Sequence, residues 1–354
     1  MAEKKCLVTG GAGFIGCAIS SYLADHFAEV VAMDNLHPQV HPNKSRPDML
    51  DKRVKFVLGD VTDVAAWDDL LKDFHPDLVI HLAAETGTGQ SLTEGSRHAS
   101  VNVVGTTQML DALVRHESLP QRIVLTSSRA VYGEGRWLDH AGAGTYPGQR
   151  TREQLERGEW DFPGLTSTPF NSGTTEPRPT SIYGATKLAQ EQVLKAWCLS
   201  MGVTPIVLRL QNVYGPGQSL INPYTGIVSL FARLAKEGKS IPIYEDGDIL
   251  RDFVFIEDVA KAIFEAMLHG KANDAPYDVG SGEATSIARL GEIIAAYYNA
   301  PAPHVTGAFR HGDVRHASCT IDDTRAALRW APAVMVEEGV KLLCRWIDTG
   351  EYQR

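Results

Sequence analysis

TGGAGFIG, at residues 9–16, is the segment that most constrains the structure of this chain. It follows the apolar run CLV at residues 6–8 and precedes an amphipathic stretch that continues to about His26. A strand, a glycine-rich turn and a helix in this order form the arrangement that a dinucleotide-binding site requires. The sequence therefore predicts such a site at the start of the chain.

Each glycine of this turn has an expected task. Gly10 lets the chain turn tightly, and Gly13 leaves room for a pyrophosphate over the helix N-terminus, whose amides and dipole favour an anion. Gly16 lets the helix pack close to the sheet. Phe14 and Ile15 lie between Gly13 and Gly16, and we expect them to belong to the same cofactor-binding turn.

Asp34 ends the second predicted strand, formed by residues 30–33. A carboxylate about 20 residues beyond the turn can accept hydrogen bonds from the adenosine ribose hydroxyls. It would repel a 2′-phosphate, and no arginine follows it directly, so NAD is favoured over NADP. Lys44 and Arg46 lie downstream, in a loop whose path the sequence leaves open.

Strand-like runs alternate with helical patterns through the first half of the chain. Further strands are predicted at residues 54–58, 78–82, 123–126 and 205–210, and helices near 64–74, 101–116 and 181–200. This alternation predicts an α/β fold with a doubly wound parallel sheet and right-handed crossovers. Ligands of such a sheet bind beyond the C-terminal strand ends.

Polar residues gather at those strand ends. At the third strand, Asp60-Val61 can place a carboxylate near an adenine amino group, but Asp60 could also cap the helix that Thr62-Asp63 begins, and both roles are compatible. His81 lies inside an apolar strand, which favours a hydrogen-bonded core histidine over a catalytic one. The remaining strand-end residues are Thr9, Ala83, Ala84, Glu85, Ser127, Ser128, Gln211 and Asn212.

Tyr183 and Lys187 lie four residues apart in SIYGATK, at the start of the helix predicted for residues 181–200. Residues i and i+4 share a helix face. The ammonium of Lys187 can therefore lie near the phenol and favour its ionised form. A phenol with a lowered pKa is a plausible base near neutral pH.

The composition is typical of a soluble enzyme. The chain has 354 residues, of which 44% are hydrophobic and 22% charged, which suits a large core and argues against disorder. The formal net charge of −9 argues against a nonspecific nucleic-acid binder. No apolar run approaches the ~20 residues of a membrane span, and the N-terminus lacks a signal peptide's apolar region, so we expect a cytoplasmic protein.

The five cysteines are scattered, with no CxxC spacing. They are Cys6, Cys17, Cys198, Cys319 and Cys344. This pattern favours reduced thiols over disulfides, and we expect no metal site.

The alternation of strands and helices breaks from Gly135 to Pro179. This stretch contains one predicted short helix, at residues 150–157, and is long for a connecting loop. Long loops are usually functional lids or flexible segments, and we expect this one to overhang the active site.

The character of the chain changes again at about Tyr214. Helices are predicted at residues 227–236, 257–268, 287–298 and 336–348, and short strands at 241–244 and 253–255. We predict a cofactor-binding domain at residues 1–213, containing the insertion 135–179. Residues 214–354 form mainly a substrate-binding domain, of which about 250–280 returns to the sheet.

Taken together, the motifs resemble the extended short-chain dehydrogenase/reductase family, in its nucleotide-sugar epimerase/dehydratase branch. The resemblance covers almost the whole chain. It rests on TGGAGFIG (9–16), Asp34, GDVTD (59–63), HLAA (81–84), VNVVGT with Asn102, TSSRAVYG (126–133), YGATK (183–187), LRLQNVYGPGQ (208–218), RDFVFIEDVA (251–260) and GDVRH (312–316).

The resemblance implies roles for individual residues. Ser128 and Tyr183 would contact the sugar hydroxyl that is oxidised, and Lys187 would hold the nicotinamide ribose. The implied NAD-binding residues are Gly10, Gly13, Phe14, Ile15, Gly16, Asp34, Asn35, Asp60, Val61, Leu82, Ala83, Ala84, Asn102, Tyr183 and Lys187. The implied substrate-binding residues are Glu85, Thr86, Ser128, Arg129, Asn212, Arg251 and Arg315.

Guanidinium groups suit the oxygens of a nucleotide diphosphate. For Arg251 the alternative is a structural ion pair with Asp252 or Asp258. For Arg315 the alternative is a plain surface position, and for Ser128 it is a helix or turn cap.

The implied reaction is a 4-epimerisation, in which the sugar is transiently oxidised at C4 and then reduced from the opposite face by bound NAD. Within the family, 4,6-dehydratases carry an Asp-Glu pair after the active-site Ser or Thr. Arg129-Ala130 occupy those positions here, so dehydration is disfavoured. A decarboxylase or a 4-keto reductase remains an alternative.

Four segments look closest to dTDP-L-rhamnose 4-epimerase-like enzymes, which make dTDP-6-deoxy-L-talose. These segments are HLAAETGTGQS (81–91), SSRAVYGEG (127–135), LQNVYGPGQSLINPYTG (210–226) and NLHPQVHP (35–42). A UDP-hexose or UDP-N-acetylhexosamine 4-epimerase is the alternative substrate assignment. A non-catalytic NAD(H)-sensing regulator is a different class, and it would not need Ser128, Tyr183 and Lys187 together.

Family members commonly form homodimers through two helices, which here would be residues 101–116 and 181–200. The candidate interface residues are Val104, Met109, Leu113, Leu188, Val193 and Trp197, which could equally be buried within one chain.

Overall fold

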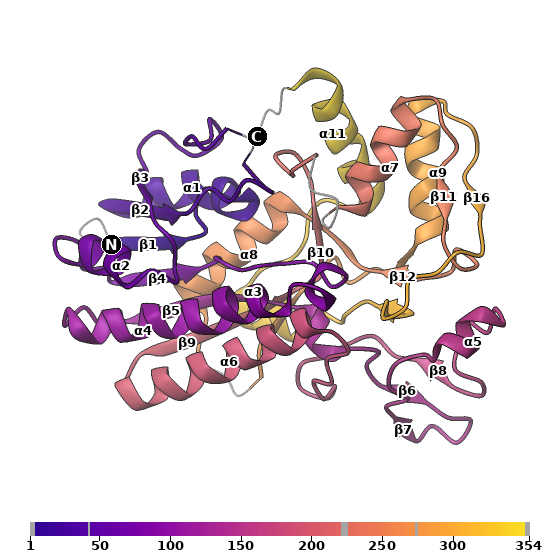
Figure 1. The fold of residues 1–354 in the computed structure, drawn as a ribbon, viewed down its shortest axis with the longest axis horizontal. Coiled ribbons are helices and arrows are strands. Elements are labelled where there is room, and N and C mark those ends of the chain that lie inside the picture. The colour runs from indigo at the N-terminus through magenta and orange to yellow at the C-terminus, as the bar shows by residue number, and fades with distance from the viewer. Residues whose placement is uncertain (1–3, 42, 221–225, 273–274, 351–354) are drawn as a thin grey trace.

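A parallel β-sheet forms the centre of the molecule (Figure 1). The computed structural model describes residues 4–41, 43–220, 226–272 and 275–350, and within them this sheet has seven strands in the order β14-β9-β5-β4-β1-β2-β3. The strands are β1 (Lys5–Thr9), β2 (Glu29–Asp34), β3 (Lys55–Leu58), β4 (Leu78–His81), β5 (Arg122–Ser128), β9 (Thr204–Leu210) and β14 (Tyr277–Val279). All neighbouring pairs are parallel, so the predicted fold class is confirmed.

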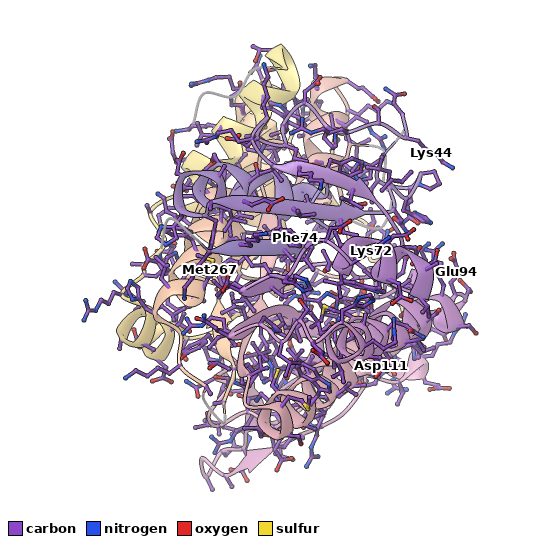
Figure 2. All side chains as sticks on the ribbon, turned by 90° about the vertical axis from the view of Figure 1, so that its left-hand side faces the viewer. Lys44, Lys72, Phe74, Glu94, Asp111 and Met267 are labelled. Carbon is purple, nitrogen blue, oxygen red and sulfur yellow. The ribbon has the colours of Figure 1, made fainter. Side chains whose placement is uncertain are left out.

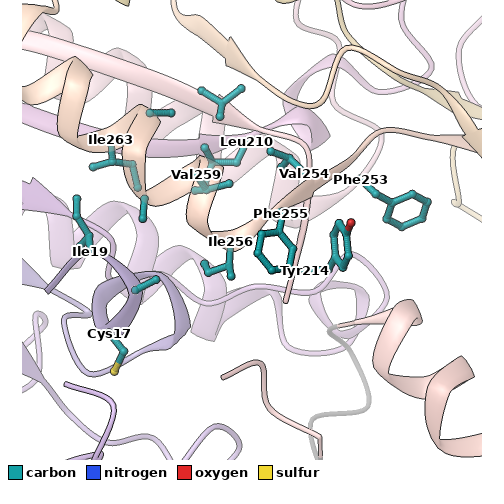
Figure 3. Packing of buried hydrophobic residues seen from close by; sticks show 14 of the residues in the cluster. Cys17, Ile19, Leu210, Tyr214, Phe253, Val254, Phe255, Ile256, Val259 and Ile263 are labelled. Atoms are coloured by element: carbon teal, nitrogen blue, oxygen red, sulfur yellow. The ribbon is translucent and has the colours of Figure 1, made fainter. Parts of the chain in front are cut away.

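Helices cover both faces of this sheet, because successive strand residues point to opposite sides. Cys6 and Val8 belong to the core on one face, and Leu7 belongs to the core on the other. The first face carries α1 (Phe14–His26) and α8 (Ile256–His269), and the second carries α2 (Val64–Leu71), α4 (Gly105–Arg115) and α6 (Ile182–Met201). Figure 3 shows Ile19 of α1 in the same cluster as Ile263 of α8.

The strand order reverses between β1 and β4. From β1 the chain runs outward through β2 and β3, and from β4 it runs the other way through β5 and β9. The loops after β1 and β4 therefore leave the sheet in opposite directions and open a crevice at its C-terminal edge, where ligands of this fold bind.

The helix predicted at residues 101–116 is longer and less regular than expected. It begins with α3 (Gly95–Ala99) and passes through a π-helical turn at Ser100–Val104 before continuing as α4. Asn102 lies in this turn. Such π-turns are rare and often mark functional sites.

The insertion at residues 135–179 is folded, rather than being one helix in a loop. It contains β6 (Trp137–Leu138), β7 (Gly144–Thr145), α5 (Arg152–Glu156) and β8 (Thr166–Ser167). The three strands pair in the order β7-β6-β8. Figure 1 shows these elements at one end of the molecule, away from the central sheet.

The last third of the chain forms smaller layers beside the sheet and also contributes to the sheet itself. Its elements are β10 (Asn212–Tyr214), α7 (Ile227–Lys236), β11 (Pro242–Ile243), β12 (Leu250–Arg251), β13 (Phe253–Phe255), α9 (Ile287–Tyr298), α10 (Asp322–Leu328) and α11 (Val336–Thr349), together with the short strands β15 (Thr285–Ser286), β16 (His304–Val305) and β17 (His316–Ala317). α7 and α9 begin and end where the sequence predicts, whereas α10 and β15 to β17 were not predicted. Residues 221–225 of the LINPYTG segment, and Pro42, lie outside the described residues.

Two further sequence expectations concern the whole chain. All five cysteines are buried, and none of them is in a disulfide. None of the helices in the described ranges combines the length and the apolar content that a membrane crossing needs.

Candidate functional site

The glycine turn is built so that backbone approaches backbone. Gly10 has φ +66°, and a Cβ at this position would lie 2.7 Å from the Ala83 nitrogen, in the loop after β4. Gly13 is the N-cap of α1 and has no side chain that could cover the first amides of the helix. These two positions leave an open cradle at the N-terminus of α1, as predicted for a pyrophosphate.

Gly16 was expected to allow close packing of the helix on the sheet, but another glycine of the turn makes this close approach. A Cβ at Gly16 would lie 2.4 Å from the Gly11 carbonyl oxygen, so Gly16 packs on the turn itself. A Cβ at Gly11 would instead lie 2.7 Å from the Ala32 Cβ on β2. The close approach to the sheet is therefore made by Gly11, because the turn folds back between α1 and β2.

A cleft of about 760 Å³, part of it open to solvent, runs along the C-terminal edge of β1, β2 and β4. The predicted cofactor residues that line it are Gly10, Gly13, Asp34, Asn35, Val61, Leu82, Ala83 and Ala84, and the predicted substrate residues are Glu85 and Thr86. Met33, His37, Gln39, Val40, His41, Gly59 and Val101 also line it and were not predicted. Four of these residues follow β2 in the chain. Their position after the end of a strand is the feature of the sequence that could have predicted them as lining residues.

Asp34 lies in the cleft with its carboxylate fixed by the backbone. The Ala12 amide donates to Oδ2 at 3.1 Å, and the Leu36 amide donates to Oδ1 at 2.9 Å. Each carboxylate oxygen has a further lone pair, so both remain able to accept from ribose hydroxyls.

Asp60 is not the cap of the following helix. Its Oδ1 accepts from the Thr62 amide at 2.8 Å, whereas Asp63 is the N-cap of α2 and accepts from Ala65. Burial raises the pKa of Asp60, but hydrogen bonds from Asn35 and Thr62 outweigh it and leave the pKa below its usual value. Asp60 is thus held ionised and joined to Asn35, one residue beyond Asp34.

The two basic residues that could have favoured a 2′-phosphate stay out of the cleft. Figure 2 shows Lys44 projecting outward at the edge of the molecule. The Arg46 guanidinium donates to the carbonyls of Leu50 and Asp51 at 3.0 and 2.6 Å. The cleft therefore presents Asp34 without a neighbouring cation from either residue, which suits NAD.

Asn102 lies behind the cleft rather than in it. Its side chain is fully buried, accepts from the Glu85 amide at 2.8 Å, and donates to the Glu85 carbonyl at 3.1 Å and to Thr186 Oγ1 at 3.0 Å. Every polar atom of the amide is used. Asn102 therefore fastens the loop after β4 to α6 and shapes the cleft indirectly.

Ser128 and Tyr183 meet where β5 ends and α6 begins. The Ser128 hydroxyl accepts from the Ala130 amide at 3.2 Å, and it lowers the pKa of the nearby Tyr183 phenol. A Cβ at Gly184 would lie 2.4 Å from the Ala130 carbonyl oxygen, so the glycine after Tyr183 lets the helix approach this turn. Ser128 thus caps a turn, as its alternative interpretation had it, and contacts the phenol as well.

That Lys187 favours the phenolate of Tyr183 stays a prediction, because the groups that act on the phenol in this structure are others. Burial raises the pKa of Tyr183, and the groups that oppose this rise are the Ser128 hydroxyl and the Arg129 guanidinium. The Lys187 ammonium donates instead to the Thr126 carbonyl at 2.7 Å and to Gln190 Oε1 at 2.5 Å. A shared helix face brings the two side chains to one side of α6 without joining their polar ends.

Lys187 is itself an unusual lysine, because its side chain is almost fully buried. Burial lowers its pKa to about 7, and the carboxylate of Glu191 opposes this fall. Glu191 is neutralised in turn by Arg209, whose Nε and Nη2 donate to it at 3.0 and 2.7 Å.

Arg129 and Arg251 form a pair of neighbouring cations. Arg129 Nε donates to Asn212 Oδ1 at 2.7 Å. Burial, together with the charge of Arg251, lowers the pKa of Arg129 to about 9. Burial also lowers the pKa of Arg251.

The alternative interpretation of Arg251, an ion pair with Asp252 or Asp258, is wrong. Its guanidinium donates to the carbonyls of Leu250 and Val314, each at 2.7 Å, and to that of Arg315 at 3.2 Å. Asp252 and Asp258 accept from other groups instead. Backbone carbonyls fix Arg251 without cancelling its charge.

Arg315 is neither on the surface nor available to a ligand. It is 1% exposed, and its guanidinium donates to Asp161 at 3.0 Å, to Asp246 at 2.7 Å and to Glu245 at 3.1 Å. All three of its nitrogen atoms are engaged with carboxylates. The sequence could not show this, because the three acids come from the insertion and from the loop after β11.

Arg150 of the insertion completes the same buried cluster. Its Nη1 and Nη2 donate to the two carboxylate oxygens of Glu245 at 2.8 and 2.9 Å. Nη1 also donates to the Trp160 carbonyl at 3.0 Å, and Nη2 to the Asp313 carbonyl at 2.9 Å. The insertion is therefore tied to the segment whose carbonyls hold Arg251.

The described residues contain no group of three or more His, Cys, Asp or Glu side chains arranged to hold a metal ion. They do fit NAD, because the Gly10–Gly13 cradle would be filled by any Cβ or capping side chain and the Asp34 carboxylate lies in the cleft beside it.

Comparison with known proteins agrees with this geometry. The dTDP-L-rhamnose 4-epimerase of Burkholderia thailandensis is 59% identical over 344 residues, which cover 97% of this chain and 95% of that protein. The structure of a Thermotoga maritima UDP-glucose 4-epimerase with UDP-glucose has a TM-score of 0.80 and 27% identity, with 98% and 99% of the two chains covered. A Thermus thermophilus UDP-glucose 4-epimerase in complex with NAD has a TM-score of 0.78 and 28% identity, with 98% and 100% covered.

Residues 6–280 match the family described as the NAD dependent epimerase/dehydratase family. This match contains the glycine turn, the cleft at the edge of the sheet and the contact between Ser128 and Tyr183. The chain belongs to the NAD dependent epimerase/dehydratase family.

Proposed function

We propose that this protein is an NAD-dependent nucleotide-sugar 4-epimerase that interconverts dTDP-L-rhamnose and dTDP-6-deoxy-L-talose. The observation that carries the proposal is the 59% identity, over nearly the whole chain, to a dTDP-L-rhamnose 4-epimerase. The geometry supports the reaction type, because the half-buried Tyr183, the Ser128 hydroxyl and the buried Lys187 ammonium all lie near the end of β5 and the start of α6.

In this proposal Tyr183 exchanges a proton with the C4 hydroxyl of the sugar. The Ser128 hydroxyl lies near the phenol and would hydrogen-bond the sugar oxygen, which would place the sugar and phenol oxygens for proton transfer. Burial favours the protonated phenol, and Ser128 and Arg129 favour the phenolate. Tyr183 can therefore accept a proton in one direction of the reaction and return it in the other.

NAD, when bound, supplies the acceptor and donor for the hydrogen that leaves and returns at C4. The Gly10–Gly13 cradle would hold its pyrophosphate, Asp34 its adenosine ribose, and Lys187 its nicotinamide ribose. Leu82 and Ala83 line the same cleft between these groups.

Arg129, Asn212 and Arg251 would hold the diphosphate of the substrate. The charge of Arg251 lowers the pKa of Arg129, and a diphosphate bound between the two guanidinium groups would neutralise both charges. In this division residues 1–213 bind the cofactor and also supply Arg129 and Asn212 to the substrate, and Arg251 comes from residues 214–354. β14 pairs with β9 in the central sheet, and α8 packs in the core on one face of that sheet.

Dehydration of the sugar fits these residues less well than epimerisation does. The residue after Ser128 is Arg129, whose guanidinium is committed to Asn212 and lies close to Arg251. Ala130 follows and contributes its amide and carbonyl to the packing of the turn. Neither can act as the carboxylic acid or the carboxylate that expulsion of water across C5–C6 would need.

The direct test is to incubate the purified chain with dTDP-L-rhamnose and, in parallel, with UDP-glucose, UDP-N-acetylglucosamine and a GDP-hexose, and to identify the products by NMR. We expect conversion of dTDP-L-rhamnose to its C4 epimer without net production of NADH. Turnover of a UDP-sugar alone would favour the alternative substrate assignment. Binding of NAD with no turnover of any sugar would favour a non-catalytic regulator.

We also propose a homodimer through α4 and α6, with a revised interface. Met109 and Leu113 are fully buried in the core of one chain and cannot serve as interface residues. The exposed apolar residues on these two helices are Val114, Ile182 and Leu199, and Val104 is exposed in the π-helical turn just before α4. Light scattering of the wild-type chain and of Leu199→Glu would test this proposal.

A further inference from the structure

A chain of buried hydrogen bonds leads away from Lys187 into the sheet. Gln190, one helical turn further along α6, accepts from the Lys187 ammonium at 2.5 Å. Its amide nitrogen donates to Thr106 Oγ1 at 2.9 Å. Gln190 and Thr106 are 0% exposed, so neither can exchange these partners for water.

Thr106 on α4 determines which atom is the donor in its hydrogen bond with His81. Its hydroxyl donates to the Asn102 carbonyl at 2.7 Å, so the oxygen can only accept from its other partners. These are the Gln190 amide and His81 Nε2, the latter at 2.9 Å. His81 must therefore carry its proton on Nε2.

His81 continues the chain to the glycine turn. With the proton on Nε2, its Nδ1 is an acceptor and receives the Thr9 hydroxyl at 2.6 Å. Burial, aided by the charge of Lys187, lowers the pKa of His81 to about 3, so the ring stays neutral. Thr9 directly precedes Gly10, at the start of the pyrophosphate cradle.

We propose that Gln190, Thr106 and His81 are positioning residues that fix the ammonium of Lys187 toward the nicotinamide ribose and couple it to the glycine turn. This inference rests on the proposed function for the role of Lys187. Two of the three N–H bonds of the ammonium are taken by Thr126 and Gln190. The described residues provide no third acceptor among its hydrogen bonds, so one N–H is left for the cofactor.

The physical reason lies in the freedom of a lysine side chain. Its flexible four-carbon stem has many rotamers, and a ligand must overcome this entropy unless the protein has already removed it. Fixed acceptors on two sides remove it in the folded protein. Gln190 can be fixed in this way only because Thr106 holds its amide, and Thr106 in turn is held by the helix backbone and by His81.

The test is a double-mutant cycle on NAD affinity, measured by calorimetric titration of the full chain. We expect Gln190→Met, which keeps the length of the side chain but loses both polar atoms, to weaken NAD binding about 10-fold. In the Lys187→Met background the same change should alter affinity less than about 2-fold, because there is no ammonium left to position. A merely structural role would weaken binding equally in both backgrounds.

Thr106 provides the second arm, in case Gln190→Met folds poorly. Thr106→Val removes the hydroxyl at constant shape and should weaken NAD binding several-fold, whereas Thr106→Ser keeps the hydroxyl and should restore it. Gln192→Met, an exposed change on the same helix, is the matched control and should leave affinity unchanged.

The inference is overturned if Gln190→Met binds NAD as the wild type does, or if its effect is the same with and without Lys187. Failure of the proposed function would look different. The chain would then turn over no nucleotide sugar, while the NAD titrations would still report on Gln190 and Thr106.

Discussion

Arg150→Met should loosen the attachment of the insertion to the rest of the molecule and lower stability more than any exposed substitution in the same segment. The Arg150 side chain is 1% exposed and grips the Glu245 carboxylate with both terminal nitrogens, at 2.8 and 2.9 Å. Methionine keeps the unbranched stem as far as the position of Nε and removes the charge, which leaves Glu245 buried with Arg315 as its remaining ion-pair partner among the described residues.

The magnitude follows from the cost of leaving a buried charge without its partner. Breaking such a pair on one side costs about 3–5 kcal/mol. We expect the lower end, about 3 kcal/mol, because Arg315 Nη1 still donates to Glu245 at 3.1 Å. The loss also reaches the substrate site, because the Asp313 carbonyl loses a donor beside the carbonyls that hold Arg251.

The assay is urea unfolding followed by tryptophan fluorescence, together with the kinetics of the epimerase. Arg152→Met is the matched control, since Arg152 is 74% exposed and pairs only with Glu156 one turn away, a contact worth at most about 0.5 kcal/mol. Arg150→Met should also raise KM for the nucleotide sugar while NAD affinity is kept. A loss of stability below about 1 kcal/mol, equal to that of the control, would refute this account of the cluster.

Three further outcomes are expected. Tyr183→Phe should abolish turnover and leave NAD affinity within about 2-fold, because it removes only the proton-carrying oxygen; calorimetry and NMR assays check both halves, and substantial turnover would contradict the acid–base role. Asp34→Ala should weaken NAD binding about 10-fold and reduce the ratio of NAD affinity to NADP affinity. If titration gives unchanged affinities for both cofactors, Asp34 does not contact the ribose. Burial raises the pKa of Glu134 from 4.5 to about 7, so the folded state holds this proton more tightly than the unfolded state. Its stabilising effect is complete below pH 4.5 and is lost as pH rises through about 7, by at most ~1.4 kcal/mol per pH unit, and urea unfolding of Glu134→Gln should lack this dependence.

The parts that could be read from residue order are those governed by local periodicity and by parallel-sheet geometry. Apolar runs and glycine spacing give β1, the turn and α1, because each depends on residues close together in the chain. The rule that ligands bind beyond the strand ends then places Asp34, Ala83 and Ser128 at one edge. Figure 1 shows these strands in a single sheet with helices on both sides, as that rule requires.

Side-chain partners across long sequence separations could not be obtained in this way. A shared helix face predicts that Lys187 lies near Tyr183, but the ammonium is held by Gln190 and Thr126, because the packing of α6 against β5 fixes the rotamer. Arg315 has the sequence context of a ligand-binding residue, yet the folded insertion surrounds it with carboxylates. Burial and the choice of partner for a charged side chain depend on which distant segments pack around it, and a one-dimensional pattern holds no record of that packing.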